Sequence, residues 1–301
     1  MSKSISDEKC PACARGVEAT QTKLNEVELL CDKHLDNINS HLNSVIDKRW
    51  SISDELILGD CLDVLGEFDD NCIDLTVTSP PYDDLRTYNG YSFDFEPIAR
   101  ELYRVTKDGG VVVWVVGDQT KNGSESGASF RQALYFKECG FNLHDTMIWE
   151  KTGMLPTQDR YYAIFEYVFI LSKGKPKTMN FIEDKPNTAG GRVQKKDAVI
   201  NKGNQKDGVG TFVRKHIGRR TNIWRIAIGK KTGHPASFPE QLAHDHIISW
   251  SNEGDTVLDP FNGSGTTTKV AKQLNRRYIG IEISPEYLEI AKERLKQGVL
   301  L

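Results

Sequence analysis

The stretch TVLDPFNGSGTTTKVAKQLNRRYIGIE, residues 256–282, decides the fold. Its pattern predicts an apolar strand, a turn at Gly263 and Gly265, a helical run, and a second apolar strand that ends in Glu282. Glycines at the start of a helix allow a ligand to approach the backbone N–H groups closely. An acid about twenty residues beyond such a turn is typical of ribose recognition. The order strand, turn, helix, strand and acid therefore indicates the nucleoside-binding half of an α/β fold.

The motif TSPPY, residues 78–82, lies far upstream and follows the apolar run at residues 73–77. It predicts a buried strand that ends in a rigid turn, because two prolines fix their own φ and push Ser79 out of the helical region. The fixed carbonyls and the Ser79 hydroxyl are acceptors for an exocyclic amino group, and Tyr82 supplies a flat ring for stacking. A proline pair after a strand also occurs as a plain exit from a sheet. Together with the first stretch, the motif favours recognition of a nucleobase amino group.

Five blocks in this order resemble the amino-methylating DNA methyltransferases, in the permuted β-type arrangement that places the Ser/Asp/Asn-Pro-Pro-Tyr loop before the cofactor turn. The blocks are LILGDCLDVL at 56–65, TSPPY at 78–82, HPASFP at 234–239, DPFNGSGTT at 259–267 and GIEISPEYLEIAKERL at 280–295. The resemblance covers roughly residues 50–297. It implies a Rossmann-like class I methyltransferase fold, an α/β domain with a mostly parallel, circularly permuted sheet of seven strands.

The resemblance also implies S-adenosylmethionine as the cofactor and methyl transfer to an amino group of a base in double-stranded DNA. The implied catalytic residues are Ser79, Pro80, Pro81 and Tyr82. The implied cofactor-binding residues are Asp60, Asp259, Pro260, Phe261, Gly263, Ser264, Gly265, Thr266 and Glu282. Asp60 is equally a candidate helix cap, since an acid after a strand commonly caps the helix that follows.

The target base is predicted from Ser79. In the family that the chain resembles, Ser at this motif position goes mostly with N4 of cytosine, and Asp or Asn mostly with N6 of adenine. We therefore expect a site-specific N4-cytosine DNA methyltransferase, with N6-adenine as the alternative. Methylation of RNA or of a protein amide stays open, as does an inactive DNA-binding relative, although the intact glycines and the intact TSPPY motif argue against loss of activity.

The charge is distributed unevenly along the chain. The formal net charge is −3, yet residues 173–231 contain 16 Lys plus Arg and 4 Asp plus Glu, a net +12 that leaves −15 for the rest. Such an asymmetry points to a polyanion bound by one segment. We interpret residues 173–232 as a target-recognition insert that contacts DNA. Its basic clusters with interleaved aromatics are Lys195-Lys196, Arg214-Lys215 and Arg219-Arg220 with Phe212 and Trp224.

The N-terminal segment, residues 1–49, carries paired cysteine and histidine positions. Cys10 and Cys13 form a Cys-x2-Cys pair, and Cys31 and His34 form a Cys-x2-His pair after a gap of seventeen residues. Three thiolates and one imidazole suit tetrahedral Zn²⁺ in a structural site. The alternative is a helical appendage with scattered reduced cysteines, but the pairing at both ends favours zinc.

The remaining patterns complete the predicted organisation. We divide the chain into the N-terminal unit 1–49, a catalytic half 50–172, the insert 173–232 and a cofactor-binding half 233–301. Helices are predicted at 95–105, 130–139 and 237–250, a fully buried strand at 111–116, and an antiparallel edge pair at 143–149 and 167–171. His244 and His246 are predicted to be surface or hydrogen-bonded residues.

The cellular setting is predicted from what the sequence lacks. No apolar run has the length of a membrane span, and the start MSKSISDEK lacks the apolar core of a signal peptide. We therefore expect a soluble, cytoplasmic, DNA-associated protein that binds no membrane. The sequence leaves open a cognate restriction endonuclease, a homodimer and the recognition sequence.

Overall fold

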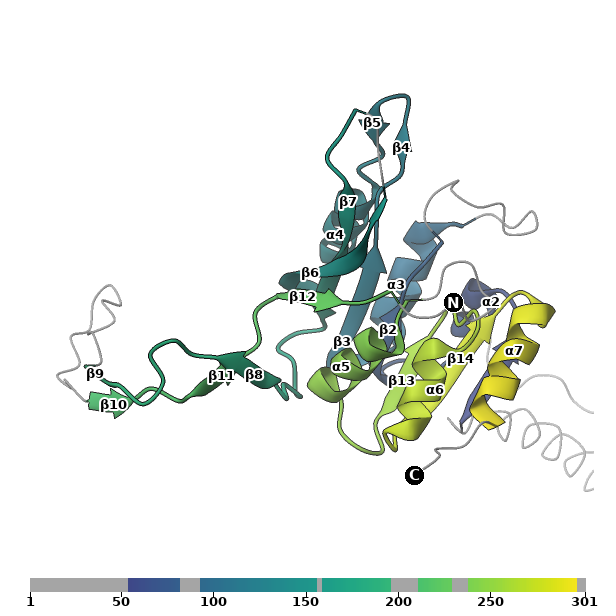
Figure 1. Ribbon diagram of the computed structural model, residues 1–301. Helices are drawn as coiled ribbons and strands as arrows, with labels where there is room; N and C mark the ends of the chain where they lie inside the picture. The colour runs from purple at the N-terminus through teal and green to yellow at the C-terminus, as the bar shows by residue number, and fades with distance from the viewer. Residues whose placement is uncertain (1–53, 82–92, 156–158, 196–210, 229–237, 297–301) are drawn as a thin grey trace, which may run out of the picture. The chain divides into compact units, whose positions relative to one another are not determined.

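The structure is a computed structural model that describes residues 54–81, 93–155, 159–195, 211–228 and 238–296 (Figure 1). The chain divides into two units, Met1–Ser51 and Ile52–Leu301. All described residues belong to the second unit. The predicted zinc ligands and Tyr82 lie outside the described residues.

A central sheet of eight strands organises the second unit. Its order is β1-β14-β13-β2-β3-β7-β6-β12. The strands are β1 (Glu55–Leu58), β2 (Ile73–Thr78), β3 (Thr106–Val116), β6 (Asn142–Leu155), β7 (Ala163–Ser172), β12 (Ile223–Ile226), β13 (Thr256–Asp259) and β14 (Arg277–Glu282). The first five strands in this order are mutually parallel, and β7 runs antiparallel to both of its neighbours.

The strand count corrects the prediction of seven. The additional strand, β12, comes from the segment predicted as a separate basic insert and pairs in parallel with β6. The pair β6 and β7 is antiparallel, as predicted, but it is not at the edge of the sheet because β12 covers β6. A strand of only four residues inside a basic segment lacks the apolar run by which the other strands were recognised.

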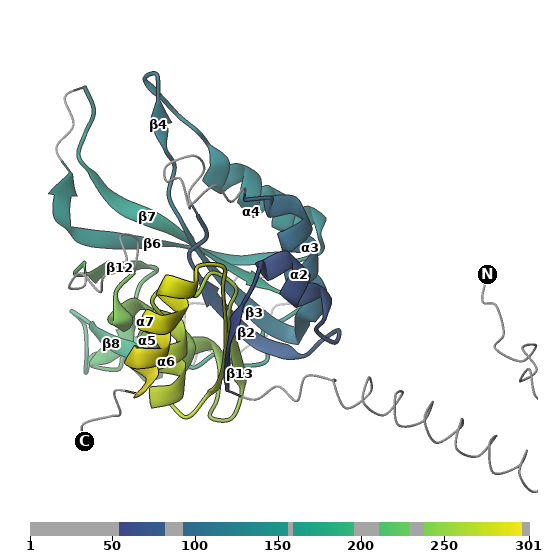
Figure 2. The ribbon, with the colours of Figure 1, turned by 90° about the vertical axis from the view of Figure 1, so that its right-hand side faces the viewer.

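Helices cover both faces of the sheet, as Figure 2 shows. They are α2 (Cys61–Gly66), α3 (Phe95–Val105), α4 (Ala128–Glu138), α5 (Glu240–Trp250), α6 (Thr266–Gln273) and α7 (Pro285–Lys296). The first three pack on one face through residues such as Leu65, Leu102 and Phe136. The last three pack on the other through residues such as Leu242 and Val270. The result is a three-layer α/β/α domain.

Strand β3 shows why the sequence folds in this way. Val112, Trp114 and Val116 belong to the core on one face of the sheet, whereas Val111, Val113 and Val115 belong to the core on the other. All six side chains are buried. A parallel strand between two helical layers requires apolar residues at every position, so the prediction of a strand buried on both faces is confirmed.

Smaller two-stranded sheets stand apart from the central sheet. One pairs β8 (Glu183–Pro186) with β11 (Ile217–Arg219), and another pairs β9 (Val193–Lys195) with β10 (Thr211–Val213). We call the described residues of this region, 183–195 and 211–219, the arm (Figure 1). A third hairpin joins β4 (Thr120–Lys121) and β5 (Ser124–Glu125). Within the described residues, no helix is long and apolar enough to cross a membrane.

Candidate active site

The two predicted motifs meet at the carboxyl ends of neighbouring strands. Strand β13 pairs with β2 through Val257 opposite Leu75 and Leu258 opposite Thr76. The helix after β13 is α6, on one face of the sheet, and the helix between β2 and β3 is α3, on the other face. Ligands of open α/β sheets bind where connections leave toward opposite faces. The structure therefore has its topological switch point between the TSPPY motif and the glycine turn.

A buried hydrogen bond joins the two motifs. Thr78, the last residue of β2, donates from Oγ1 to Oδ1 of Asp259, the last residue of β13, at 2.7 Å. The backbone N–H of Phe261 donates to the same carboxylate oxygen at 3.1 Å. From α6, Thr267 Oγ1 donates to the carbonyl of Val77 at 3.0 Å. These bonds fix the end of β2 against the start of the glycine turn.

The buried environment of Asp259 shifts the pKa of its carboxyl group. The residue is 2% exposed. Burial raises the pKa of Asp259 to about 6, while the hydrogen bonds from Thr78 and the Phe261 N–H act in the opposite direction. Without those donors, burial would favour the neutral acid still more strongly. The hydroxyl of Thr78 therefore both locates the carboxylate and supports its charged form.

The glycine turn takes a shape that favours glycine. Gly263 has φ 50° and Gly265 has φ 78°, both in the left-handed region. A Cβ on Gly265 would lie 2.8 Å from the Cβ of Ala291 on α7. The side chain of Glu282 holds the turn from the next strand, because Oε2 accepts from Gly263 N at 2.7 Å and Oε1 accepts from Ser284 N at 2.8 Å.

Glu282 is thus a structural partner of the turn in addition to its predicted role. Its carboxylate is buried, and this burial raises the pKa of Glu282 against the lowering effect of the backbone N–H donors. Each carboxylate oxygen keeps further acceptor capacity. Ribose binding by Glu282 stays a prediction.

A residue that the sequence analysis did not single out stabilises the glycine turn through hydrogen bonds. Arg294 of α7 donates from Nη1 to the carbonyl of Ser264 at 2.6 Å and to Ser264 Oγ at 3.0 Å. Its Nη2 donates to Glu240 Oε1 at 2.7 Å, and Lys269 Nζ donates to the same oxygen at 2.7 Å. In the sequence, Arg294 looks like an ordinary charged position of an amphipathic helix, so no pattern distinguished it.

The predicted catalytic residues follow β2 directly. Ser79 and Pro81 are half-buried and Pro80 is buried. Tyr82 lies outside the described residues. Across the switch point, the half-buried ring of Phe261 meets Phe93 edge-on at 5.6 Å and Trp114 edge-on at 6.2 Å between ring centroids.

Asp60 follows β1 and caps helix α2. Its carboxylate accepts from Leu62 N at 2.8 Å as the N-cap of α2, which confirms the capping prediction. Strand β1 pairs with β14 so that Leu58 lies opposite Glu282, and Gly59 N donates to the Glu282 carbonyl at 3.0 Å. Asp60 therefore follows the strand next to Glu282, and its exposed side chain stays a predicted cofactor contact.

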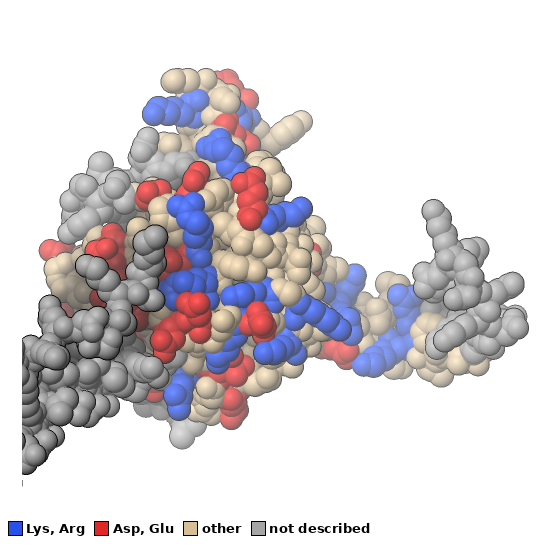
Figure 3. Space-filling model, turned by 180° about the vertical axis from the view of Figure 1, so that it is seen from behind, with Lys and Arg blue, Asp and Glu red and all other residues tan. Residues whose placement is uncertain are grey.

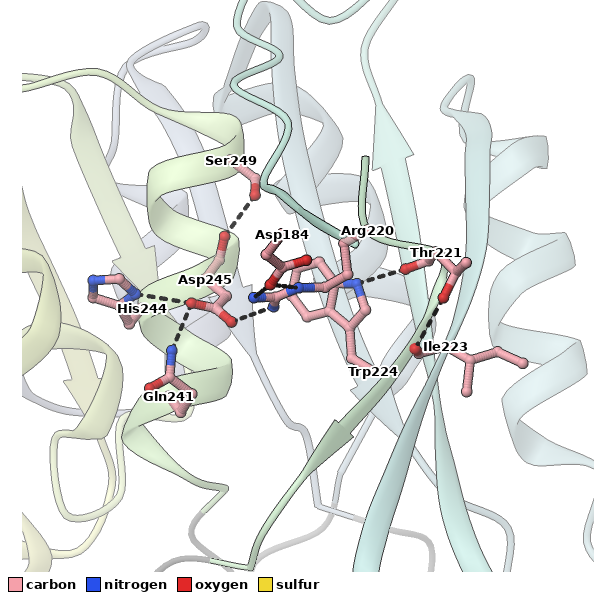
Figure 4. A network of polar contacts seen from close by, with 9 residues as sticks. All are labelled: Asp184, Arg220, Thr221, Ile223, Trp224, Gln241, His244, Asp245 and Ser249. Carbon is pink, nitrogen blue, oxygen red and sulfur yellow. Dashed lines mark hydrogen bonds and ion pairs between the residues drawn. The ribbon is translucent and has the colours of Figure 1, made fainter. Parts of the chain in front are cut away.

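Of the residues in the predicted DNA-binding clusters, Lys215 and Arg220 form ion pairs within the protein. DNA binding by the clusters stays a prediction. Arg220 forms ion pairs with Asp184 and Asp245 (Figure 4). Lys215 pairs with Glu183, and Arg225 of β12 pairs with Glu150. Figure 3 shows basic and acidic groups side by side over the rear face of the domain, with further basic groups on the arm.

The predicted aromatic positions of the insert also differ. Phe212 is exposed, as expected for a nucleic-acid contact, but Trp224 is buried. Its ring stacks on His246 with centroids 4.5 Å apart, and its Nε1 donates to the carbonyl of Thr221 at 2.9 Å. Trp224 does not stack on a base, because its ring belongs to the core between β12 and α5.

His246 corrects a further prediction. Its side chain is fully buried, and neither ring nitrogen has a hydrogen-bond partner among the described residues. Burial lowers the pKa of His246 to about 3. The prediction of a surface or hydrogen-bonded residue is therefore wrong for His246. His244 is partly exposed and contacts Asp245 Oδ1 at 2.9 Å, in agreement with the prediction.

The predicted zinc site is outside the part of the chain that the structure covers. Cys10, Cys13, Cys31 and His34 all lie in residues 1–53, which are not described. Among the described residues, no three His, Cys, Asp or Glu side chains gather into a group that could hold a metal ion. Zinc binding by the N-terminal unit stays a prediction.

Comparison with known proteins agrees with this geometry. The family model described as DNA methylase matches residues 73–293. The orphan methyltransferase M.BamHII of Bacillus amyloliquefaciens is 60% identical over 248 residues, which cover 77% of this chain and 92% of that protein. TTHA0409 of Thermus thermophilus, in complex with S-adenosyl-L-methionine, is 28% identical with a TM-score of 0.55, covering 81% of this chain and 93% of that one.

A further structure supports the fold. The cytosine-N4-specific PvuII DNA methyltransferase has a TM-score of 0.59 at 22% identity and covers 83% of this chain and 88% of its own. The family model spans both the TSPPY motif and the glycine turn, which the structure joins at one switch point. The chain therefore belongs to the DNA methylase family of amino methyltransferases.

Proposed function

We propose that this protein transfers a methyl group from S-adenosylmethionine to the exocyclic N4 amino group of a flipped cytosine in duplex DNA. The observation that carries the proposal is the hydrogen bond of 2.7 Å between Thr78 and Asp259, which holds the Ser79-Pro80-Pro81 segment against the glycine turn. A methyl transfer requires the nucleophile and the methyl donor to be held in line. Two motifs on rigid neighbouring strands meet that requirement.

The residues of the turn fit the cofactor. Helix α6 begins at Thr266 with Gly265 as its N-cap, and no side chain of the described residues caps it. Its first backbone N–H groups therefore suit an anionic or polar group of the ligand. Residues from Asp259 to Thr266 would hold the nucleoside, together with Glu282 and Asp60. When bound, S-adenosylmethionine supplies an activated methyl group on its sulfonium.

The chain's own groups act on the base. An exocyclic amino nitrogen is a poor nucleophile because its lone pair is delocalised into the ring. Acceptors at Ser79 and at the Pro80 carbonyl take hydrogen bonds from the amino hydrogens, so the nitrogen can pyramidalise and its developing positive charge is stabilised. Tyr82 stacks on the flipped base. No covalent intermediate with the enzyme is required.

The choice of cytosine rests on Ser79. The fold similarity to the cytosine-N4-specific PvuII enzyme is compatible with it. N6-adenine is the second candidate, since an amino group on either base offers the same two hydrogens to the same acceptors. The permuted arrangement is supported by the order of the chain, in which β2 precedes β13.

The exposed basic side chains of the arm support duplex DNA as the proposed substrate. Lys185, Arg192 and Arg214 are exposed side chains of the arm, and within the described residues they form no ion pair. Such cations suit phosphate groups and give salt-dependent affinity. The arm is accordingly the proposed target-recognition element.

Parallel assays test the proposal against the other substrate classes. Tritiated S-adenosylmethionine is supplied with duplex DNA, single-stranded RNA or a protein mixture of matched mass, and a Ser79→Ala/Tyr82→Ala variant serves as the control. We expect label in DNA alone, and none with the variant. Label in RNA or protein with none in DNA would overturn the proposal.

The zinc unit is a separate part of the proposal. We expect purified protein to carry about one zinc ion per chain through Cys10, Cys13, Cys31 and His34. Elemental analysis of the protein and of a Cys10→Ser/Cys13→Ser variant measures this directly. Absence of zinc from the parent protein, even after expression with added zinc, would contradict the site.

A further inference from the structure

The strands of the arm pair with one another and, among the described residues, not with the central sheet. The two-stranded sheets β8–β11 and β9–β10 pair internally, and the chain rejoins the central sheet at β12. The direction of the arm must therefore be set where residues 180–182 leave the domain and residues 219–221 return. At this base of the arm, the backbone N–H of Arg220 donates to the Ile182 carbonyl at 2.9 Å and so connects the outgoing segment to the returning one.

Helix α5 is the element on which this base rests. The outgoing segment is fixed at the carboxyl end of the helix, because Asn180 N donates to the Ser249 carbonyl at 2.8 Å and Asn180 Nδ2 donates to the Ile248 carbonyl at 3.1 Å. The returning segment is fixed at the middle of the helix by Arg220, whose Nη1 donates to Asp245 Oδ2 at 2.5 Å. Because the two segments at the start of the arm are attached to α5 at two separate points, the direction of the arm is fixed. A single attachment would let the arm rotate about that point.

Arg220 joins the arm to helix α5, as Figure 4 shows through its contacts with Asp184 and Asp245. Besides Asp245 on α5, its guanidinium donates from Nε to Asp184 Oδ2 of β8 at 2.9 Å. One planar fork thus spans the arm and the helix, a geometry available to Arg and not to Lys. The guanidinium also lies over the Trp224 ring, 5.0 Å from its centroid, and Trp224 in turn stacks on His246.

The burial of Asp245 makes the attachment selective for a cation. Its side chain is 4% exposed, and its other oxygen accepts from Gln241 Nε2 at 2.7 Å. A buried carboxylate that loses its cationic partner is strongly disfavoured. We therefore expect Arg220 to keep its ion pair with Asp245 and not to contact DNA. Lys185, Arg192 and Arg214, in contrast, are exposed and are the proposed phosphate contacts.

The same helix reaches the cofactor side of the domain. At its first residue, Glu240 accepts from Arg294, which also donates to the Ser264 carbonyl in the glycine turn. Helix α5 is therefore held at its first residue by contacts to the glycine turn and in its middle by contacts to the base of the arm. It connects the two parts of the domain rigidly.

We propose that Arg220 is a positioning residue for target recognition, which sets the direction of the arm relative to the Ser79-Pro80-Pro81 segment by joining Asp184 of β8 to Asp245 of α5. This inference rests on the proposed role of the arm in recognising DNA. Arg220 is not among the residues proposed to hold the base or the cofactor. Its loss turns the arm and weakens the match between the recognised sequence and the base presented for methylation.

Three variants test the proposal in the full-length protein. Arg220→Met removes both ion pairs of Arg220, Arg220→Lys can keep one of them, and Asp184→Asn removes the arm-side charge at a half-exposed position without disturbing Asp245. Arg225→Gln is the matched control, because Arg225 is also an ion-paired arginine after the arm but its partner, Glu150, lies on β6. Each is assayed on a plasmid pool with a randomised insert, sequenced so that methylated bases are read directly.

We expect kcat/KM for DNA to fall about tenfold in Arg220→Met and less in Asp184→Asn and Arg220→Lys, with a broader set of methylated sequences. The affinity for S-adenosylhomocysteine, measured by calorimetry, should change less than about twofold. A residue that only stabilised the fold would lower the melting temperature and leave the methylated sequences unchanged below it. Unchanged sequences and unchanged DNA kinetics in Arg220→Met and Asp184→Asn would overturn the inference.

An Arg192→Ala/Arg214→Ala variant separates this inference from the proposed function. If that variant weakens DNA binding while the Arg220 variants behave like Arg225→Gln, the positioning role fails and the arm's role in recognition stands. If it leaves DNA binding unchanged, the arm does not recognise DNA, and the positioning role fails with it.

Discussion

Thr78 Oγ1 donates a hydrogen bond of 2.7 Å to Asp259 Oδ1 and joins two motifs that lie 181 residues apart in the chain. The bond connects the last residue of β2 to the last residue of β13, at the point where connections leave the sheet toward opposite faces. The relative position of base and cofactor in the proposed reaction depends on this junction. Its removal should therefore affect stability, cofactor affinity and turnover together.

Thr78→Val tests the junction because valine keeps the branched shape and lacks the donor. We expect the free energy of unfolding to fall by about 2 kcal/mol, since a buried carboxylate loses a hydrogen bond. The KM for S-adenosylmethionine should rise and kcat should fall, each by about tenfold. Thr78→Ser keeps the hydroxyl and should retain most of both. Equal behaviour of the two variants in denaturation and steady-state kinetics would show that the bond does not position the site.

Tyr82→Ala separates base binding from cofactor binding. We expect methyl transfer to fall by about a hundredfold, because a base stacked on an aromatic ring gains about 1–3 kcal/mol. The dissociation constant for S-adenosylhomocysteine, measured by calorimetry, should stay nearly unchanged, and Tyr82→Phe should keep most of the activity. A collapse of cofactor binding in Tyr82→Ala would show that the proposed division of roles is wrong.

Arg294→Met removes the brace beneath the glycine turn. Its side chain is 12% exposed and donates to both the carbonyl and the hydroxyl of Ser264. We expect affinity for S-adenosylhomocysteine to fall about tenfold, with kcat at saturating cofactor changing less. Lys296→Met is the control, because Lys296 is on the same helix and forms its ion pair with the exposed Glu293. Equal cofactor affinity in the two variants would contradict a role for Arg294 in the turn.

His246→Phe tests the consequence of a buried imidazole whose nitrogens have no partner among the described residues. Burial lowers the pKa of His246 to about 3, so below about pH 6.5 the unfolded chain takes up a proton that the folded chain does not. Stability that is present above this pH is therefore lost as the pH falls toward 3. Phe can keep the stacking on Trp224 and has no proton to take up.

The pH dependence gives this prediction a magnitude. When the pH is lowered from about 7.5 to about 5, the unfolding free energy of His246→Phe should rise by about 2 kcal/mol relative to that of the parent protein. Denaturant unfolding at both values measures the gain. Parallel pH profiles for parent and variant would show that His246 is protonated equally in the folded and unfolded states.

The parts of the fold that the sequence predicted share a strong local signal. The run Val111–Val116 is apolar at every position, and helix α3 was predicted with the bounds that the structure shows, 95–105. The glycine turn was predicted because strand, turn, helix and acid follow one another within about thirty residues, as in a βαβ unit. These features depend on neighbouring residues, so one sequence suffices to find them.

The parts that were missed depend on contacts between distant residues. Arg220 stands beside Arg219 in a basic segment, and its sequence neighbourhood does not reveal that Asp184 and Asp245 neutralise it. Strand β12 is too short and too polar on one face to be recognised alone. His246 was predicted to be a surface or hydrogen-bonded residue, because the sequence of α5 does not indicate the Trp224 ring that β12 places against it.

The central claim is the identity of the reaction, and nucleoside mass spectrometry tests it most directly. Plasmid DNA is isolated from cells that express the protein and from cells that express the Ser79→Ala/Tyr82→Ala variant, then digested and compared. We predict N4-methylcytosine in the first sample and none in the second. N6-methyladenine instead would keep the fold and mechanism but overturn the base assignment, and no new methylated base in either sample would contradict DNA as the substrate.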